Sequence, residues 1–275
     1  MAVTIAKIRE MKQQGEKITM LTAYDYSTAK LVDAAGIPLI LVGDSLGTVI
    51  LGYDSTIPVT LEVMLHHTKA VVRGVSNALV VGDMPFMTYH VSVEDALRNA
   101  GRFLQEAGCK AVKLEGGVTV EDKIKKIVDC GIPVMGHIGL TPQSINQLGG
   151  HRIQGKTAEA ARRLLDDALA VERAGAFAVV LETVPAPLAA LISRKLSIPT
   201  IGIGAGAGCD GQVQVINDLL GSFTDFVPKH AKQYAHLADS MSSAFSQYLA
   251  DVKSGAFPTE ANSFPMDESV LKGLA

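Results

Sequence analysis

The chain has 275 residues, of which 48% are apolar and 19% charged, a composition typical of a folded globular protein rather than a disordered one. The net charge of −3, without a long basic run, argues against nucleic acid as the main partner. Residues 1–17 lack the apolar core of a signal peptide, and no stretch is apolar for long enough to cross a membrane. The three cysteines form no metal-binding or redox pattern, so we expect reduced thiols in a cytoplasmic protein.

In the first half of the chain, short apolar runs alternate with amphipathic segments. Ser27 is the predicted cap of the second helix, and Ser92 with Asp95 resembles a capping box. The long polar loop 45–58 is a candidate lid. The predicted elements are a helix at 5–14, a strand at 18–25, a helix ending near Gly36, a strand at 39–44, a helix at 60–73, a strand ending at Asp83, a helix at 92–107, a strand at 111–115 and a helix at 119–130.

The second half continues the alternation, with a second long loop at 140–156. The polar tail at 253–275 is expected to be ordered only against a neighbouring subunit. The predicted elements are a strand at 132–139, a helix at 157–174, a strand at 178–182, a helix begun by Pro185 and Pro187, a strand at 198–204, a short helix at 212–220, a weak eighth strand around 225–228 and a last helix at 231–252.

Eight alternations of buried strand and helix predict parallel strands joined by right-handed crossovers. Their number and the chain length favour one α/β domain over residues 1–275, a (β/α)8 TIM barrel at about 18–250 with an N-terminal helix and a C-terminal tail. An open doubly wound sheet is the alternative. That fold usually has fewer strands and a glycine-rich turn after the first strand, which this chain lacks.

Four predicted strands end in an acidic residue. In a barrel the carboxyl ends of the strands surround one mouth, so these acids should converge there with Lys113 and His137. A single acid at a strand end is more often a helix cap, but four in register favour function. The acids are Asp44, Asp83, Glu115 and Glu182.

Four neighbouring carboxylates repel one another unless a cation or shared protons intervene. Oxygen ligands without nearby cysteines suit Mg²⁺, which typically takes one or two protein carboxylates. Asp44 and Asp83 are the predicted metal pair, and Glu115 could bind directly or through water. Glu182 lies farther round the barrel and is the candidate general base, with metal ligation as its competing role.

The remaining polar groups leave alternatives open. Lys113 could neutralise Glu115 or bind an anionic substrate, and His137 could be structural or contact the ligand. The glycine-rich run 202–208 follows the seventh strand, where barrels often bind phosphate. Equally, its residues could be small so that the loop can pass close over the barrel mouth. A hard metal with a base suggests that a 2-oxo acid is converted to its enolate.

Several motifs, taken in order, resemble the ketopantoate (3-methyl-2-oxobutanoate) hydroxymethyltransferase family from about residue 5 to residue 264. None is decisive alone, but their joint order is specific. They are TAYD at 22–25, VGDSLG at 42–47, GYDST at 52–56, DMPF at 83–86, VKLEGG at 112–117, GHIGLTPQS at 136–144 and IGIGAG at 201–206.

This resemblance implies transfer of a one-carbon unit from 5,10-methylenetetrahydrofolate to 3-methyl-2-oxobutanoate in pantothenate synthesis. It implies one Mg²⁺ per subunit on Asp44, Asp83 and Glu115, and a homodecamer. Glu182 would accept the proton. The oxo acid would contact Asp44, Ser45, Asp83 and Lys113, and we add His137 as a candidate contact.

Two rival functions remain. Mg²⁺-dependent lyases and mutases of the phosphoenolpyruvate mutase and isocitrate lyase group also use such a barrel mouth. Many of them carry a reactive cysteine in a mobile loop, whereas the loops 45–58 and 140–156 contain none. A noncatalytic binding barrel would not need a metal pair, a lysine and an independent base together.

Overall fold

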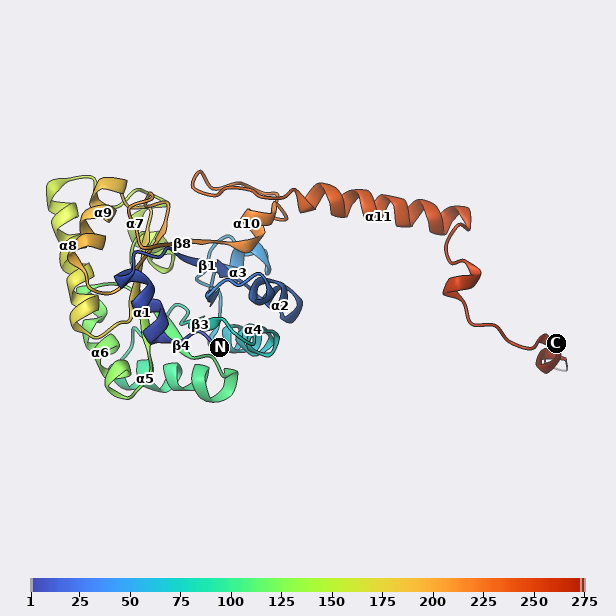
Figure 1. The fold of residues 1–275 in the computed structure, drawn as a ribbon, viewed down its shortest axis with the longest axis horizontal. Coiled ribbons are helices and arrows are strands. Elements are labelled where there is room, and N and C mark those ends of the chain that lie inside the picture. Colours follow the sequence, from blue (N-terminus) through green and yellow to red (C-terminus); the bar gives the residue numbers. More distant parts are fainter. Residues whose placement is uncertain (1, 273, 275) are drawn as a thin grey trace.

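A computed structural model describes residues 2–272 and 274 and shows a closed barrel of parallel strands (Figure 1). Met1, Gly273 and Ala275, which fall within the predicted domain and tail, lie outside the described residues. Each strand pairs with the next, and the last pairs with the first. The strands are Ile18–Thr22 (β1), Leu39–Val42 (β2), Leu79–Asp83 (β3), Ala111–Glu115 (β4), Val134–Gly139 (β5), Ala178–Glu182 (β6), Thr200–Ile203 (β7) and Gly211–Gln214 (β8). The predicted barrel is confirmed, and the open sheet was the wrong alternative.

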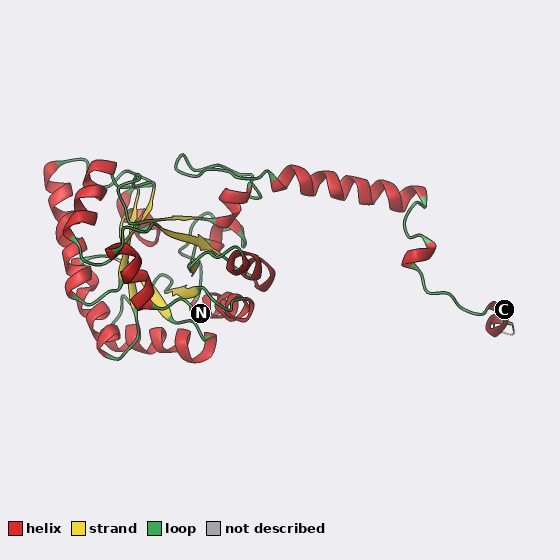
Figure 2. Ribbon diagram, in the orientation of Figure 1, coloured by secondary structure: helices red, strands yellow, loops and turns green. Residues whose placement is uncertain are grey.

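Helices surround the strands, which lie inside the ring (Figure 2). The helices are Ile5–Gln13 (α1), Tyr26–Ala34 (α2), Leu46–Val49 (α3), Leu61–Gly74 (α4), Val93–Arg102 (α5), Glu121–Asp129 (α6), Ile145–Leu148 (α7), Ala158–Arg173 (α8), Ala186–Lys195 (α9), Ile216–Leu220 (α10) and Leu237–Ser254 (α11). α5 continues as a π-helical turn, 103–107, and the short helices α3 and α7 lie within the two predicted long loops. Asp25, not Ser27, caps α2, because its carboxylate accepts the N–H of Thr28 at 2.9 Å.

The apolar strand residues divide into two cores because successive side chains point to opposite faces. In β2, Leu39 and Leu41 belong to a core inside the barrel, whereas Ile40 and Val42 pack outward against the helices. This two-sided burial explains why the strands are nearly continuous apolar runs.

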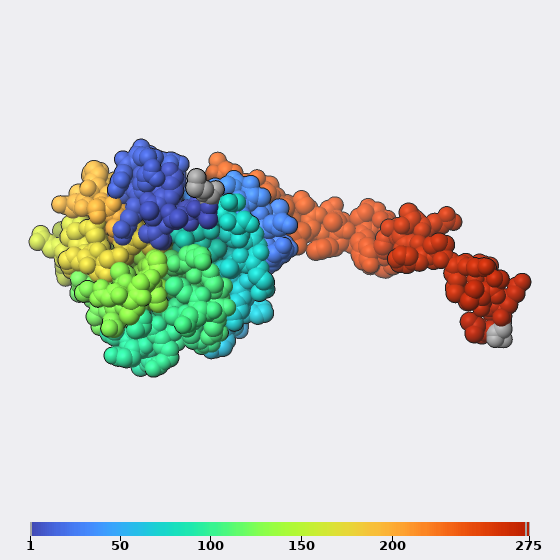
Figure 3. Space-filling model, turned by 60° about the horizontal axis from the view of Figure 1, so that its bottom comes forward, coloured from blue at the N-terminus to red at the C-terminus, as the bar shows by residue number. Residues whose placement is uncertain are grey.

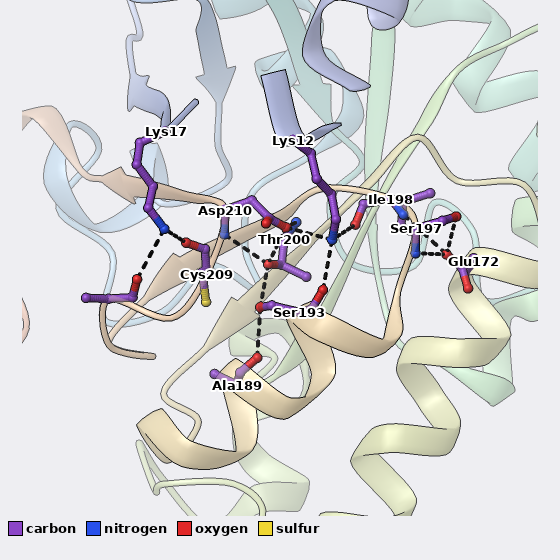
Figure 4. A network of polar contacts seen from close by, with 11 residues as sticks. Lys12, Lys17, Glu172, Ala189, Ser193, Ser197, Ile198, Thr200, Cys209 and Asp210 are labelled. Carbon is purple, nitrogen blue, oxygen red and sulfur yellow. Dashed lines mark hydrogen bonds and ion pairs between the residues drawn. The ribbon is translucent and has the colours of Figure 1, made fainter. Parts of the chain in front are cut away.

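Helix α1 closes the barrel at the end opposite the carboxyl ends of the strands. Ile8 and Met11 join the interior core. Lys12 donates hydrogen bonds of 2.9 Å to the carbonyl oxygens of Ser193 and Ile198 and to Oδ2 of Asp210 (Figure 4). These contacts attach α1 to the segments around β7 and β8.

The predicted position of the eighth strand was wrong. β8 is Gly211–Gln214, which overlaps the start of the segment 212–220 predicted as a helix, and residues 225–228 are irregular. Gly211 meets Ile18 of β1 so closely that a Cβ there would lie 2.3 Å from the Ile18 carbonyl oxygen. Pairing with both β7 and β1, rather than apolar content, makes this short segment a strand.

Helix α11 and the tail project away from the barrel (Figures 1 and 3). The last helix begins at Leu237, not at residue 231 as predicted, and none of its residues is buried. Along one side it exposes an apolar stripe at helical spacing, formed by Met241, Phe245, Tyr248, Leu249 and Val252. Within residues 2–272, no helix is long and apolar enough to span a bilayer.

Candidate active site

The predicted site residues all line one cavity of about 610 Å³ at the carboxyl ends of the strands, here called the mouth cavity. Its size is within the range of roughly 300–1,000 Å³ that suits small organic ligands. The strand register explains the convergence: Asp83 lies opposite Lys113, and Glu115 lies opposite His137. The predicted residues that the structure brings together are Asp44, Ser45, Asp83, Lys113, Glu115, His137 and Glu182.

Lys113 forms a buried ion pair with Asp83. Its Nζ lies 2.6 and 2.7 Å from the two carboxylate oxygens, and the two side chains are 3% and 1% exposed. Burial, opposed by the charge of Lys113, raises the pKa of Asp83 to about 7. Burial disfavours the Lys113 ammonium, but the carboxylates of Asp83, Glu115 and Asp44 outweigh it and raise its pKa. Lys113 therefore neutralises Asp83 first, with Glu115 farther away at 3.6 Å.

Glu115 carries an unsatisfied oxygen. Its Oε2 accepts the backbone N–H of Gln143 at 3.0 Å, whereas its buried Oε1 has no hydrogen-bond partner among the described residues. Burial raises the pKa of Glu115 well above its usual value. A buried acceptor without a partner is costly, so this oxygen is suited to a ligand, a water or a cation.

His137 is buried between two acids. Its Nδ1 lies 3.5 Å from Oε1 of Glu115 and its Nε2 lies 3.1 Å from Oε2 of Glu182, but neither contact has hydrogen-bond alignment. Burial and the charge of Lys113 lower the pKa of His137, which favours the neutral imidazole. Glu182 ends β6 at the edge of the cavity, apart from the ion pair, and its side chain remains 15% exposed.

Gln143 links the acids, and the sequence prediction gave it no role. Its Nε2 donates to Oδ2 of Asp44 at 2.8 Å, and its Oε1 accepts the hydroxyl of Tyr89 at 2.6 Å. The Tyr89 hydroxyl in turn accepts the backbone N–H of Glu115 at 3.2 Å. The motif at 136–144 contains Gln143, but nothing in its spacing indicated a contact with an acid on another strand. The loop after β5 therefore orients Asp44 and Glu115.

Ser45 and Tyr24 form the wall beside Asp44. The Tyr24 hydroxyl and the Ser45 Oγ lie 2.8 Å apart, within hydrogen-bond distance. The backbone N–H of Asp44 donates to Oδ2 of Asp83 at 3.1 Å, so the two predicted metal ligands are neighbours. Ser45 is thus held next to the carboxylates, with its side chain on the mouth cavity.

The donor set fits a hard divalent cation. Asp44 and Asp83 offer carboxylate oxygens, and the unpaired Oε1 of Glu115 lies in the same cavity. Within residues 2–272 and 274, no three His, Cys, Asp or Glu side chains are already arranged as a metal cage. Mg²⁺ needs no such cage, because it commonly binds one or two carboxylates and keeps water or substrate elsewhere.

The glycines after β7 serve packing in this structure. A Cβ on Gly206 would lie 2.5 Å from the Cβ of Ala186, and one on Gly208 would lie 2.6 Å from that of Ala190. Both alanines belong to α9, so the loop needs small residues to pass close to this helix. This contact supports the packing interpretation of the glycine-rich run.

Comparisons with known proteins identify the family of this chain. A family model described as ketopantoate hydroxymethyltransferase matches residues 2–260. A 3-methyl-2-oxobutanoate hydroxymethyltransferase from Dehalococcoides mccartyi (strain CBDB1) is 66% identical over 274 residues, covering 100% of this chain and 98% of the relative. Another, from Acetivibrio thermocellus, is 58% identical over 271 residues, covering 98% and 96%.

The fold is also found in more distant enzymes. A phosphoenolpyruvate phosphomutase from Streptomyces platensis subsp. rosaceus has a TM-score of 0.61 and 17% identity, covering 98% of this chain and 94% of that chain. This likeness shows a shared barrel alone, whereas the relatives of 66% and 58% identity are hydroxymethyltransferases. The chain therefore belongs to the ketopantoate hydroxymethyltransferase family and is an enzyme of the transferase class.

Proposed function

We propose that this enzyme transfers a hydroxymethyl group from 5,10-methylenetetrahydrofolate to 3-methyl-2-oxobutanoate, giving 2-dehydropantoate for pantothenate synthesis. The names of its relatives support the acceptor and the reaction class. The observation that carries the proposal is the mouth cavity, in which an ammonium and three buried carboxylates lie beside a separate acid. This combination suits an anionic oxo acid and removal of its proton.

Binding of the oxo acid uses groups on β4 and β5 and just after β2. The Lys113 ammonium and the Ser45 hydroxyl donate to its oxygens, and neutral His137 lies beside them. Asp44, Asp83 and Glu115 hold one Mg²⁺ per subunit, with Glu115 bound directly or through water. When bound, the ion supplies Lewis-acid stabilisation of negative charge on the keto oxygen.

Glu182 is the base in this proposal. It accepts the proton from C3 of the oxo acid, and the electron pair of the broken C–H bond forms the enolate. C3 then forms a bond to the one-carbon unit of the folate. One water supplies the hydroxyl oxygen, and the bonds from that carbon to the folate nitrogens break, leaving tetrahydrofolate. Because Glu182 has no ion-pair partner other than His137 among the described residues, it can take up and return this proton.

Proton exchange tests the enolate independently of the folate. With Mg²⁺ alone, the protein should replace the C3 proton of 3-methyl-2-oxobutanoate with deuterium from solvent, as observed by NMR. Glu182→Gln should keep Mg²⁺ and oxo-acid binding but lose exchange by about 10²–10⁴-fold. Glu159→Gln, on the exposed side of α8, is the control and should exchange normally.

The outcomes separate the parts of the proposal. Absence of exchange by folded, Mg²⁺-loaded protein contradicts the enolate. Exchange that survives in Glu182→Gln removes Glu182 as the base. Formation of 2-dehydropantoate only after methylenetetrahydrofolate is added establishes the donor, whereas formation without it excludes the folate.

The projecting helix α11 supports the expectation of a homo-oligomer. Its exposed apolar stripe has no partner within residues 2–272 and 274, and such stripes normally pack against another surface. We propose that α11 and the tail pack against a second copy within the decamer that the family resemblance implies.

A further inference from the structure

Asp218 is a buried carboxylate on the mouth cavity that the proposed reaction does not use. It lies in the first turn of α10, is 7% exposed and lines the cavity. No hydrogen bond or ion pair among the described residues involves its side chain. Burial raises the pKa of Asp218 to about 6, so the carboxylate is mostly ionised at pH 8.

The local fold gives this acid only the weak electrostatic benefit of lying in the first turn of the five-residue helix α10. The start of α10 is held instead by the Thr22 Oγ1, which accepts the backbone N–H of Ile216 at 2.9 Å. The N–H of Leu219 continues the helix to the carbonyl oxygen of Val215. The Asp218 oxygens are not among the fully buried unsatisfied atoms and face the cavity, so they can accept hydrogen bonds from a ligand that carries donors.

Asp218 lies close to the proposed oxo-acid site. Asp218, Thr22 and Ser45 line the same cavity, and the hydrogen bond from the Ile216 N–H to Thr22 Oγ1 places the start of α10 at the carboxyl end of β1, two residues before Tyr24. The Tyr24 hydroxyl contacts Ser45, beside the metal-binding acids. A ligand on Asp218 would therefore adjoin the oxo acid across this pair.

Besides the acids and Lys113, the mouth cavity has the groups of a site for a flat, partly polar ring. Val213, Val215 and Phe226 line it with apolar groups, and Lys229 lies on the same cavity. A small oxo acid fills only part of about 610 Å³, so a second ligand has room. The remaining surface offers one acidic acceptor, apolar walls and a cationic side chain.

A reduced folate matches these groups. Its 2-amino-4-oxopyrimidine edge carries an amino group and a ring N–H that point the same way, a pattern that a carboxylate accepts through both oxygens, as it does with arginine. Its ring is flat enough for the apolar walls, and its acidic tail suits the Lys229 ammonium.

We propose that Asp218 binds the 2-amino-4-oxopyrimidine edge of the folate donor, with the folate ring against Val215 and Phe226. This inference rests on the proposed function, because it assigns the binding site of that donor. It makes Asp218 a binding residue that does not participate in proton removal from the oxo acid.

Direct binding of tetrahydrofolate to Mg²⁺-loaded full-length protein tests the role of Asp218. Asp218→Asn keeps the size of the side chain but replaces an acceptor oxygen with a donor group. Its Kd for tetrahydrofolate, measured anaerobically by calorimetry, should rise about 10–100-fold, as expected for a charge-assisted pair. Asp225→Asn, in the exposed loop after α10, is the matched control and should bind normally. C3 exchange should be normal in both variants.

A folate analogue separates recognition from a structural effect. The analogue is tetrahydrofolate in which a methyl group replaces the 2-amino group. The wild type should bind the analogue at least about 10-fold more weakly than tetrahydrofolate. Asp218→Asn should bind the analogue and tetrahydrofolate with equal affinity. Equal tetrahydrofolate affinity in Asp218→Asn and the wild type would overturn the inference. So would an analogue effect of the same size in both proteins. If the wild type exchanges the C3 proton but binds no tetrahydrofolate, the donor assignment itself is wrong, and the role of Asp218 is wrong with it.

Discussion

Removing the charge of Lys113 should expose the cost of gathering three acids in the barrel mouth. Lys113→Met keeps an unbranched side chain but removes the ammonium that lies 2.6 and 2.7 Å from the oxygens of Asp83. Because both partners are almost fully buried, the remaining Asp83 carboxylate would have neither solvent nor a counter-ion. Breaking such a pair typically costs about 3–5 kcal/mol of unfolding free energy.

Urea unfolding at pH 8 in EDTA measures this cost, with protein concentrations matched because oligomers gain stability with concentration. Lys125→Met is the control, since its pair with Asp129 is solvent-exposed and should contribute less than about 1 kcal/mol. Excess Mg²⁺ should recover part of the lost stability in Lys113→Met by supplying positive charge. If the two variants lose similar stability in EDTA, the reasoning about the buried pair is wrong.

The pH dependence gives a second check of the same reasoning. The pKa of Asp83 is raised to about 7, so the folded state holds this proton more strongly than the unfolded state. Its contribution to stability is therefore largest at low pH and decreases as pH rises from about 4 to 7. Without the opposing charge of Lys113, the pKa rises further and the loss extends to higher pH. Lys113→Met should therefore be less destabilised at pH 6 than at pH 8.

Three further predictions concern other parts of the chain. Asp33→Asn should cost about 1–3 kcal/mol, because the carboxylate accepts the backbone N–H groups of residues 76–78. Burial alone would raise the pKa of Asp33, but these bonds outweigh it and lower the pKa. The wild type should therefore lose this contribution as pH falls below about 4, through the lowered pKa of the folded state. The variant, followed by the same urea titration, should show no such loss. Gln143→Leu removes the hydrogen bond to Asp44 and should weaken Mg²⁺ binding by about 10–100-fold in calorimetry; unchanged affinity would show that Asp44 is held by other contacts. Phe245→Ser with Leu249→Ser should reduce the sedimentation coefficient if the α11 stripe joins copies, and an unchanged value would separate assembly from this helix.

The strands with long apolar runs could be predicted from local sequence because each is buried on both faces. β2, β3, β4 and β6 all carry this signal; the last three end at acids of the mouth cavity, and β2 ends two residues before Asp44. β8 lacks it, since it contains Gln212 and Gln214 and only one large apolar residue. Its strand conformation comes from hydrogen bonding to both neighbours when the barrel closes, which local periodicity does not encode.

The cap of α2 illustrates the same limit on a smaller scale. Ser27 and Asp25 are both good capping residues, so composition alone could not choose between them. The strand before them ends at Thr22, earlier than predicted, and this leaves Asp25 at the position from which its carboxylate reaches Thr28. The end of β1 differs by three residues from the prediction, and this difference decides that Asp25 rather than Ser27 caps α2.

The sequence by itself determined the barrel and the set of acids at its mouth, because strand polarity in a parallel barrel brings every carboxyl end to one side. Only the tertiary structure decided which charges meet. It brought the Lys113 ammonium closer to Asp83, at 2.6 Å, than to Glu115, at 3.6 Å, and it placed the Gln143 amide within hydrogen-bond distance of Asp44. It also left the Asp218 carboxylate on the same cavity with no partner in the described part of the chain. The physical reason is that strand order specifies only the end of the barrel at which a side chain lies. Hydrogen bonds and ion pairs depend on side-chain directions and distances, which arise only once the barrel has closed.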